Sequence, residues 1–161
     1  MKKHLALLIG LFVNLSLAHA DQCDKAVVRA LMNEAPKVSS DASGFKNGYD
    51  VRKLSFDEFK ARIDKASSYA FNASTAQWSP PLQETSKKLS ILANNPQPSY
   101  VAYELTWQGW VYIPTNIQVD IHHGILVDTR TCDALTPVST YFHFFLGEKR
   151  SFNPTHTPSD W

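Results

Sequence analysis

The sequence predicts one α+β domain over residues 21–150, with about three N-terminal helices packed on one face of a roughly five-stranded antiparallel meander. Helical patterns come first along the chain and strand patterns follow, an order typical of α+β proteins. Apolar residues recur at every second position through much of the stretch from Tyr100 to Arg130, which indicates half-buried strands.

The first twenty residues have the three parts of a secretory signal peptide. Lys2 and Lys3 form a basic start, an apolar run extends from Leu5 to Leu17, and an Ala-x-Ala pattern ends at Ala20. The apolar run is too short for a membrane span. We therefore expect cleavage after Ala20, a periplasmic or secreted location, and a mature chain without a membrane span.

Two cysteines, Cys23 and Cys132, remain in an exported chain, and an oxidising compartment favours a disulfide between them. Cys23 shares one face of a predicted helix over residues 24–35 with Val27 and Leu31, so it points toward the core. The bridge would tie this helix to the end of the meander and stabilise the fold by roughly 4–5 kcal/mol. A redox-active pair is the alternative, but the chain has no Cys-x-x-Cys motif.

Two further helices have clear start signals. Ser55 is followed three residues later by Glu58, a capping box that predicts a helix beginning at this point. Ser79 followed by proline predicts the start of a third helix, which ends before Asn94. The segment 37–50 is rich in Ser, Gly, Asp and Asn and predicts a loop.

Two glycines within the meander, Gly109 and Gly124, predict three-residue hairpin loops at residues 107–109 and 122–124. Loops of this length keep apolar residues opposite one another: Leu105 with Val111, Tyr103 with Ile113, Ile121 with Ile125 and Val119 with Val127. A third turn is predicted at residues 114–116.

The rest of the chain contains one more strand and a tail. Residues 138–146 are apolar on both faces, which indicates a central or covered strand. Residues 151–161 are polar, contain two prolines and predict a flexible C-terminal tail. In the order of its elements, the chain resembles the cone-shaped fold of the nuclear-transport-factor-2 type, and a cystatin-like sheet wrapped on a helix is the rival resemblance.

Charge and motifs exclude several function classes. Removing Lys2 and Lys3 from the 16 basic residues leaves 14 against 15 acidic residues, a net charge of −1 without a basic run. Nucleic acid is therefore not an expected partner, because phosphate binding needs clustered Lys and Arg. The chain has no nucleophile elbow, no phosphate-binding loop and no dinucleotide fingerprint, so no cofactor is predicted. The sequence leaves the oligomeric state open.

Four polar residues of the meander share one parity and are predicted to line one surface: Glu104, Gln118, Asp120 and His122. Asp beside His on one strand face can orient an imidazole or exchange a proton with it. Glu104, Asp120 and His122 are therefore weak candidates for acid–base catalysis. The simpler interpretation is the wet face of a half-exposed sheet.

The histidines do not predict a metal site. His122 and His123 are adjacent, whereas zinc sites draw on three or four ligands with wider spacing. His143 and His156 lie too far along the chain for the sequence to bring them together. His143, on a very apolar strand, is better explained as a hydrogen-bonded interior histidine.

Aromatic residues gather in the first predicted hairpin and suggest a binding surface. The residues predicted to bind a partner are Trp107, Trp110, Tyr112, His122 and His123. Trp107 is expected in the turn and Trp110 on the wetter face, and Trp and Tyr dominate binding hot spots. The alternative is a second core layer beneath the helices.

Two functions follow from these observations. The first is an exported cell-envelope binding protein whose partner is another envelope protein, in the form of an inhibitor or immunity protein acting on a toxin or hydrolase. The second is a small enzyme or ligand carrier with an acid–base pocket between helices and sheet. A carboxyl group in such a pocket should have a raised pKa.

Overall fold

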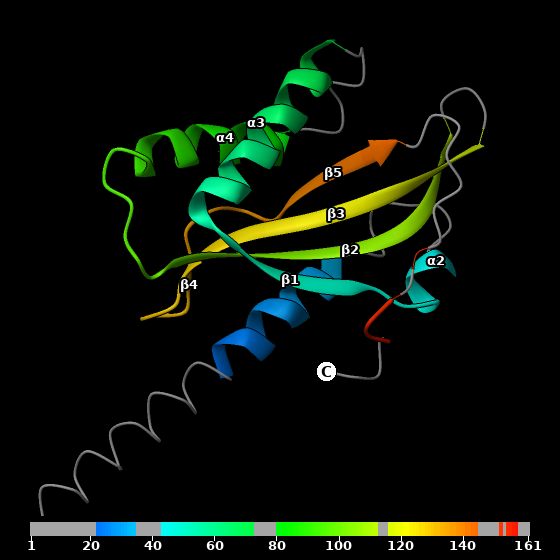
Figure 1. The fold of residues 1–161 in the computed structure, drawn as a ribbon, viewed down its shortest axis with the longest axis horizontal. Helices are drawn as coiled ribbons and strands as arrows, with labels where there is room; N and C mark the ends of the chain where they lie inside the picture. The colour runs from blue at the N-terminus through cyan, green and yellow to red at the C-terminus, as the bar shows by residue number, and fades with distance from the viewer. Residues whose placement is uncertain are drawn as a thin grey trace, which may run out of the picture.

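The computed structural model describes residues 22–34, 43–72, 80–112, 116–144, 152 and 154–157 (Figure 1). The predicted signal peptide and most of the predicted tail lie outside this part. The elements are a first helix at residues 22–34, α2 (Ser43–Lys46), β1 (Asp50–Ser55), α3 (Phe56–Asn72), α4 (Pro80–Leu92), β2 (Tyr100–Tyr112), β3 (Asn116–Asp128), β4 (Asp133–Ala134) and β5 (Ser139–Phe144).

The five strands form one antiparallel sheet, which confirms the predicted α+β class. The strand order is β1-β2-β3-β4. Strand β5 also pairs with β3, on the same side as β4 but with a different stretch of β3. Helices α3 and α4 are inserted between β1 and β2 rather than preceding all strands. The strand β1 has no counterpart among the predicted strands, because its exposed Arg52 and Lys53 conceal the period of two.

The two predicted glycine loops are wrong, because β2 and β3 run straight through them. Trp107 pairs with Ile121 and Glu104 pairs with Gly124 in one ladder that extends from Tyr100 to Asp128. A three-residue loop and an uninterrupted strand give every side chain the same parity, so alternation alone cannot distinguish them. The chain instead reverses between β2 and β3, next to the predicted 114–116 turn, of which the structure describes only Asn116.

Both glycines occupy places where a side chain has no room. A Cβ atom added at Gly124 would lie 2.5 Å from Cε2 of Phe59, which is fully buried in α3. At Gly109 the added atom would lie 2.5 Å from Cδ1 of Ile121. Glycine within a strand commonly marks such a close approach. These glycines therefore allow side chains to pack against the backbone of β2 and β3.

The packing of the helices differs from the predicted single layer, because apolar clusters form on both faces of the sheet. One cluster joins the first helix and α2 to one face: Val27, Val28, Leu31, Phe45, Tyr49, Tyr103, Leu105, Trp107, Val119, Ile121, Ile125 and Val127. The second joins α3 and α4 to the other face: Leu54, Phe56, Phe59, Ile63, Leu82, Leu89, Ala102, Leu126 and Tyr141. In β2 and β3, buried apolar residues occur at both odd and even positions. Each face of the sheet therefore packs against other elements.

The disulfide between Cys23 and Cys132 is confirmed, with the two Cα atoms 5.5 Å apart. Cys23 is 3% exposed and belongs to the cluster around the first helix. The bridge therefore fastens this helix to the segment that follows β3, as the sequence predicts.

The capping box at the start of α3 is also confirmed. The Ser55 N–H donates to Oε2 of Glu58 at 2.8 Å, and the Glu58 N–H donates to Oγ of Ser55 at 3.3 Å. The hydrogen bonds from the Ser55 backbone and hydroxyl lower the pKa of Glu58. These contacts set the residue at which β1 ends and α3 begins.

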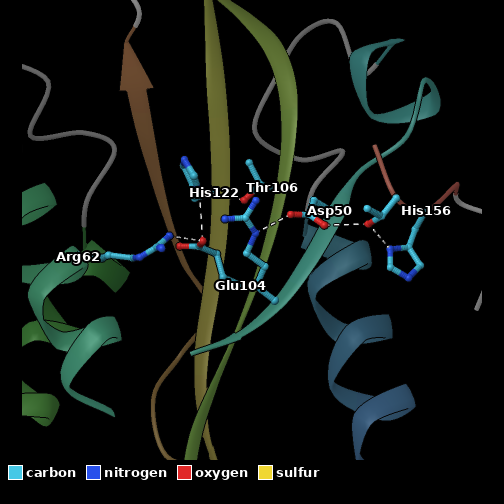
Figure 2. A network of polar contacts seen from close by, with 8 residues as sticks. Asp50, Arg62, Glu104, Thr106, His122 and His156 are labelled. Atoms are coloured by element: carbon cyan, nitrogen blue, oxygen red, sulfur yellow. Dashed lines mark hydrogen bonds and ion pairs between the residues drawn. The ribbon is translucent and has the colours of Figure 1, made fainter. Parts of the chain in front are cut away.

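The described part of the C-terminal tail is joined to the start of β1. Tyr49 and His156 exchange two backbone hydrogen bonds of 2.9 and 3.0 Å, and their rings stack with centroids 5.8 Å apart. The hydroxyl of Thr155 donates to Oδ1 of Asp50 at 2.8 Å. Figure 2 shows His156 on one side of β1 and Glu104 on the other, with Asp50 between them.

The contact between Gly124 and Phe59 gives a stability prediction. We expect Gly124→Ala to lower the free energy of unfolding by about 1–3 kcal/mol, because the added methyl group overpacks the site. Phe59→Leu alone should also destabilise, by leaving a cavity. The double variant should lose at least about 0.5 kcal/mol less than the sum of the two, since the smaller side chain admits the methyl group. Urea denaturation measures all four proteins, and strict additivity would contradict the contact.

Candidate functional site: the α3 face of the sheet

The two faces of the sheet carry different chemistry. We call the side packed against α3 and α4 the α3 face; on it lie Glu104, Thr106, Gln108 and Trp110 of β2, Gln118, Asp120 and His122 of β3, and Tyr141 and His143 of β5. The opposite side, packed against the first helix, is the disulfide face; it carries Tyr103, Leu105, Trp107 and His123.

The register places the predicted polar residues on one face, as their shared parity requires. Across β2 and β3, Thr106 pairs with His122, Gln108 with Asp120 and Trp110 with Gln118. Across β3 and β5, His122 pairs with Tyr141 and Asp120 with His143. Cross-strand neighbours of this kind are close enough to interact.

Glu104 is not on a wet surface, because α3 covers it and leaves it 1% exposed. Its carboxylate accepts hydrogen bonds from Arg62 of α3 and from the Tyr141 hydroxyl. Nδ1 of His122 lies 3.6 Å from Oε1 of the same carboxylate. Figure 2 shows Arg62 extending from the helix side and His122 from the sheet, both toward Glu104.

These contacts set the protonation of Glu104. Burial would raise its pKa, but the hydrogen bond and charge of His122, with Tyr141 and Arg62, outweigh burial and lower the pKa to about 2. Burial and the neighbouring carboxylate raise the pKa of Tyr141 well above its usual value. Glu104 is therefore an anion and Tyr141 a neutral donor at neutral pH.

His122 is held by two further contacts. Its Nδ1 is 3.0 Å from the Thr106 hydroxyl oxygen, and its ring stacks on that of Tyr141 with centroids 5.0 Å apart. The imidazole is thus placed between a hydroxyl, an aromatic ring and a carboxylate. Such contacts fix its orientation within the sheet.

The chemistry of this group suits a buried ion pair better than catalysis. A carboxylate with a pKa near 2 is a weak general base at neutral pH, whereas a pocket for acid–base chemistry was expected to raise that pKa. The nearest groups, Arg62, Tyr141 and His122, already contact the carboxylate. A surface hollow of about 560 Å³ lies along residues 53–57, 96–98, 100 and 101 and is lined by none of these residues.

Exposure rises along the α3 face toward the end of β2. Ala102 and Glu104 are 0% and 1% exposed and Thr106 is 8% exposed, whereas Trp110 is 48% exposed. In Figure 1, α4 lies over the end of the sheet where β2 begins, and β2 and β3 continue well beyond it. We call the far part the uncovered end; it consists of Gln108, Trp110, Gln118, Asp120 and His143.

The uncovered end combines an aromatic ring with amides and a carboxylate. Nε2 of Gln118 donates to Oε1 of Gln108 at 3.2 Å, so these two amides brace each other across the strands. Oδ1 of Asp120 is buried and has no hydrogen-bond donor within the described part of the chain. A buried oxygen without a donor is uncommon in folded proteins, and it distinguishes Asp120 from Glu104.

Trp107 and His123, predicted to contact a partner, lie instead in the core of the disulfide face. Both are 0% exposed. Nε1 of Trp107 donates to Nε2 of His123 at 2.9 Å, which leaves Nδ1 of His123 to donate to the Thr140 hydroxyl at the same distance. Burial, with a smaller effect of His122, lowers the pKa of His123 to about 3. The correction follows from the register, since no turn exposes residues 107 and 123.

The remaining predicted binding residues have different positions. Trp110 is exposed, as predicted, and lies on the α3 face, where it pairs with Gln118. Tyr112 is the last residue of β2, and its side chain lies outside the described part. His122 is on the α3 face and only partly exposed.

Among the described residues, no group of three or more His, Cys, Asp or Glu side chains could hold a metal ion. No helix in the same part of the chain is long and apolar enough to cross a bilayer. Comparison with known protein families, curated proteins and solved structures gives no match for this chain.

Sequence reasoning missed Arg62 and Tyr141 as partners of Glu104. Arg62 lies 42 residues before Glu104 and Tyr141 lies 37 residues after it, so no local spacing joins them. One signal was present: a carboxylate on a strand that is covered requires a cation from the covering element. Arg62 is a basic residue one position before Ile63, which packs on the sheet.

The low pKa of Glu104 gives a pH prediction. Because the folded pKa is below the usual value of about 4.3, the ion pair stabilises the fold above that pH and loses this effect as pH falls toward 2. Glu104→Gln should therefore cost about 3 kcal/mol at pH 7, and the difference from wild type should shrink between pH 5 and pH 2. Chemical denaturation across pH measures this. Glu84→Gln, an exposed control on α4, should cost under about 1 kcal/mol, and a pH-independent Glu104→Gln difference would contradict the assignment.

The lowered pKa of His123 gives a second prediction of how stability changes with pH, over a different pH range. Its folded pKa of about 3 is below the usual 6.5, so stability falls as pH drops from about 6.5 toward 3, by at most about 1.4 kcal/mol per pH unit. In His123→Gln the dependence of unfolding free energy on pH between 7 and 5 should be shallower than in wild type, whatever the overall loss. Glu104→Gln should keep the wild-type slope in that range. Equal slopes in wild type and His123→Gln would contradict a buried neutral imidazole.

Proposed function

We propose that this protein is an exported binding protein of the cell envelope that holds a partner protein on the uncovered end of the α3 face. An inhibitor or immunity protein that blocks a toxin or hydrolase is the form that fits best. The observation that carries the proposal is the 48% exposure of Trp110 on a sheet whose other described central tryptophan, Trp107, is fully buried.

An exposed tryptophan on a rigid sheet suits a binding role. Trp is enriched among the residues that dominate binding energy, and it loses little conformational freedom on binding. Trp110 lies within β2, whose ladder with β3 is continuous on both sides of Gly109. The ring is therefore positioned before a partner arrives, which lowers the cost of association.

The cell-envelope location rests on the signal-like start and on the cysteines. A disulfide between residues 109 apart persists in an oxidising compartment and fits an exported protein. The alternative is an enzyme or carrier with an acid–base pocket. It gains no support, because Glu104 is buried in an ion pair with Arg62 and its pKa is lowered.

A capture experiment tests the proposal. The mature protein is immobilised, incubated with envelope extract, and the retained proteins are quantified by mass spectrometry. Trp110→Ala should retain the partner at least tenfold less, as expected for a central anchor residue. Its thermal midpoint should stay within a few degrees of wild type, since an exposed ring contributes little to the core.

Ile91→Ala provides the matched control. Ile91 is 62% exposed on α4 and is the other large apolar side chain with high exposure in the described part of the chain. This variant should retain the partner as wild type does. Equal retention by wild type and Trp110→Ala, or equal loss in both variants, would refute the role of the uncovered end.

A further inference from the structure

We infer that the uncovered end binds an arginine side chain of the partner, with the guanidinium stacked on Trp110 and hydrogen-bonded to Asp120. This inference rests on the proposed function and names the chemistry of the partner. It follows from the carboxylate of Asp120, the exposed ring of Trp110 and the register that joins them.

Asp120 is a partly exposed anion that no described residue pairs with. Oδ1 of Asp120 has no hydrogen-bond donor among the described residues, and no ion pair joins this carboxylate to a Lys or Arg of that part of the chain. The Asp120 side chain as a whole is partly exposed, so a cationic ligand can approach the carboxylate from solvent, and a hydrogen bond to a charged carboxylate is stronger than one between neutral groups. By contrast, Glu104 on the same face already has Arg62.

The register brings Asp120 and Trp110 within reach of one ligand group. Asp120 pairs with Gln108, and Trp110 pairs with Gln118, so the ring and the carboxylate are diagonal neighbours on one face. Diagonal neighbours in an antiparallel pair are about 7–8 Å apart, a span that one aromatic and one planar cationic group can fill. The two glutamines are bonded to each other and line the same surface.

The required ligand is planar and cationic. A cation above an indole ring is attracted by the ring quadrupole, and Trp is the strongest aromatic partner for it. A guanidinium can stack flat on the ring and still direct an N–H group at a carboxylate beside the ring, whereas a lysine ammonium is a compact charge that does not stack. Asp120 is the only Asp, Glu, Lys or Arg in the five-residue uncovered end, so the surface complements a cation.

The test uses nuclear magnetic resonance titration of the full mature protein with the peptide acetyl-Gly-Arg-Gly-amide. We expect a saturable shift of the Trp110 indole N–H resonance, which is identified by its loss in Trp110→Phe. The same peptide with citrulline in place of arginine is neutral but has nearly the same shape. It should bind at least fivefold more weakly.

Two variants complete the test. Asp120→Asn should weaken binding of the arginine peptide at least fivefold while keeping the wild-type spectrum elsewhere, and Ile91→Ala should leave binding unchanged. Equal binding of the citrulline peptide, or wild-type affinity in Asp120→Asn, would overturn the inference. A shift of the Trp110 resonance by chitotriose but not by the arginine peptide would overturn it in favour of a sugar ligand.

The result separates this inference from the proposed function. If Trp110→Ala loses the captured partner but the arginine peptide does not bind, the arginine inference fails and the proposed function stands. If the arginine peptide binds through Asp120 but capture does not depend on Trp110, the site stands and the proposed function fails.

Discussion

The charge of Glu104 constrains where α3 can lie. A carboxylate that is 1% exposed must keep a cation and hydrogen-bond donors, because removing one partner of a buried pair is costly even where the pair itself adds little net stability. Arg62 is that cation, and it belongs to α3. The helix is therefore held over the half of the sheet that contains Glu104. Trp110, farther along the same strand, is 48% exposed.

The long β2–β3 ladder turns neighbouring residues to opposite environments. His122 and His123 are adjacent, yet the first stacks on Tyr141 beside a carboxylate and the second lies beside Trp107 in an apolar core. The α3 face thus contains a charged group with its ion-pair partners, whereas the disulfide face contains buried neutral side chains. Alternation of side chains along a strand explains why two adjacent histidines cannot serve one metal ion here.

Local signals predicted local structure well. The capping box at Ser55 and Glu58 and the shared parity of the polar residues agree with the structure. The disulfide, between residues 109 apart, was predicted from the cysteine count and not from a local pattern. The glycine loops failed because parity is unchanged by a three-residue loop, so Gly109 and Gly124 were equally consistent with turns and with close packing. Contacts between residues far apart in the sequence could not be predicted from local patterns. The spacing of residues does not indicate that Arg62 contacts Glu104, nor which part of the sheet a helix covers.

The ion pair of Glu104 and the uncovered end occupy different parts of the α3 face. On the α3 face, Glu104 and Thr106 are buried and His122 is half-buried, whereas Trp110 and Gln118 are exposed. A surface built on rigid strands but outside the core can change its side chains without unfolding the domain. Trp110 is costly to expose and adds little to the core, and Asp120 retains an acceptor that the described chain does not use. Both features fit the proposal of a partner that stacks on Trp110 and donates a hydrogen bond to Asp120.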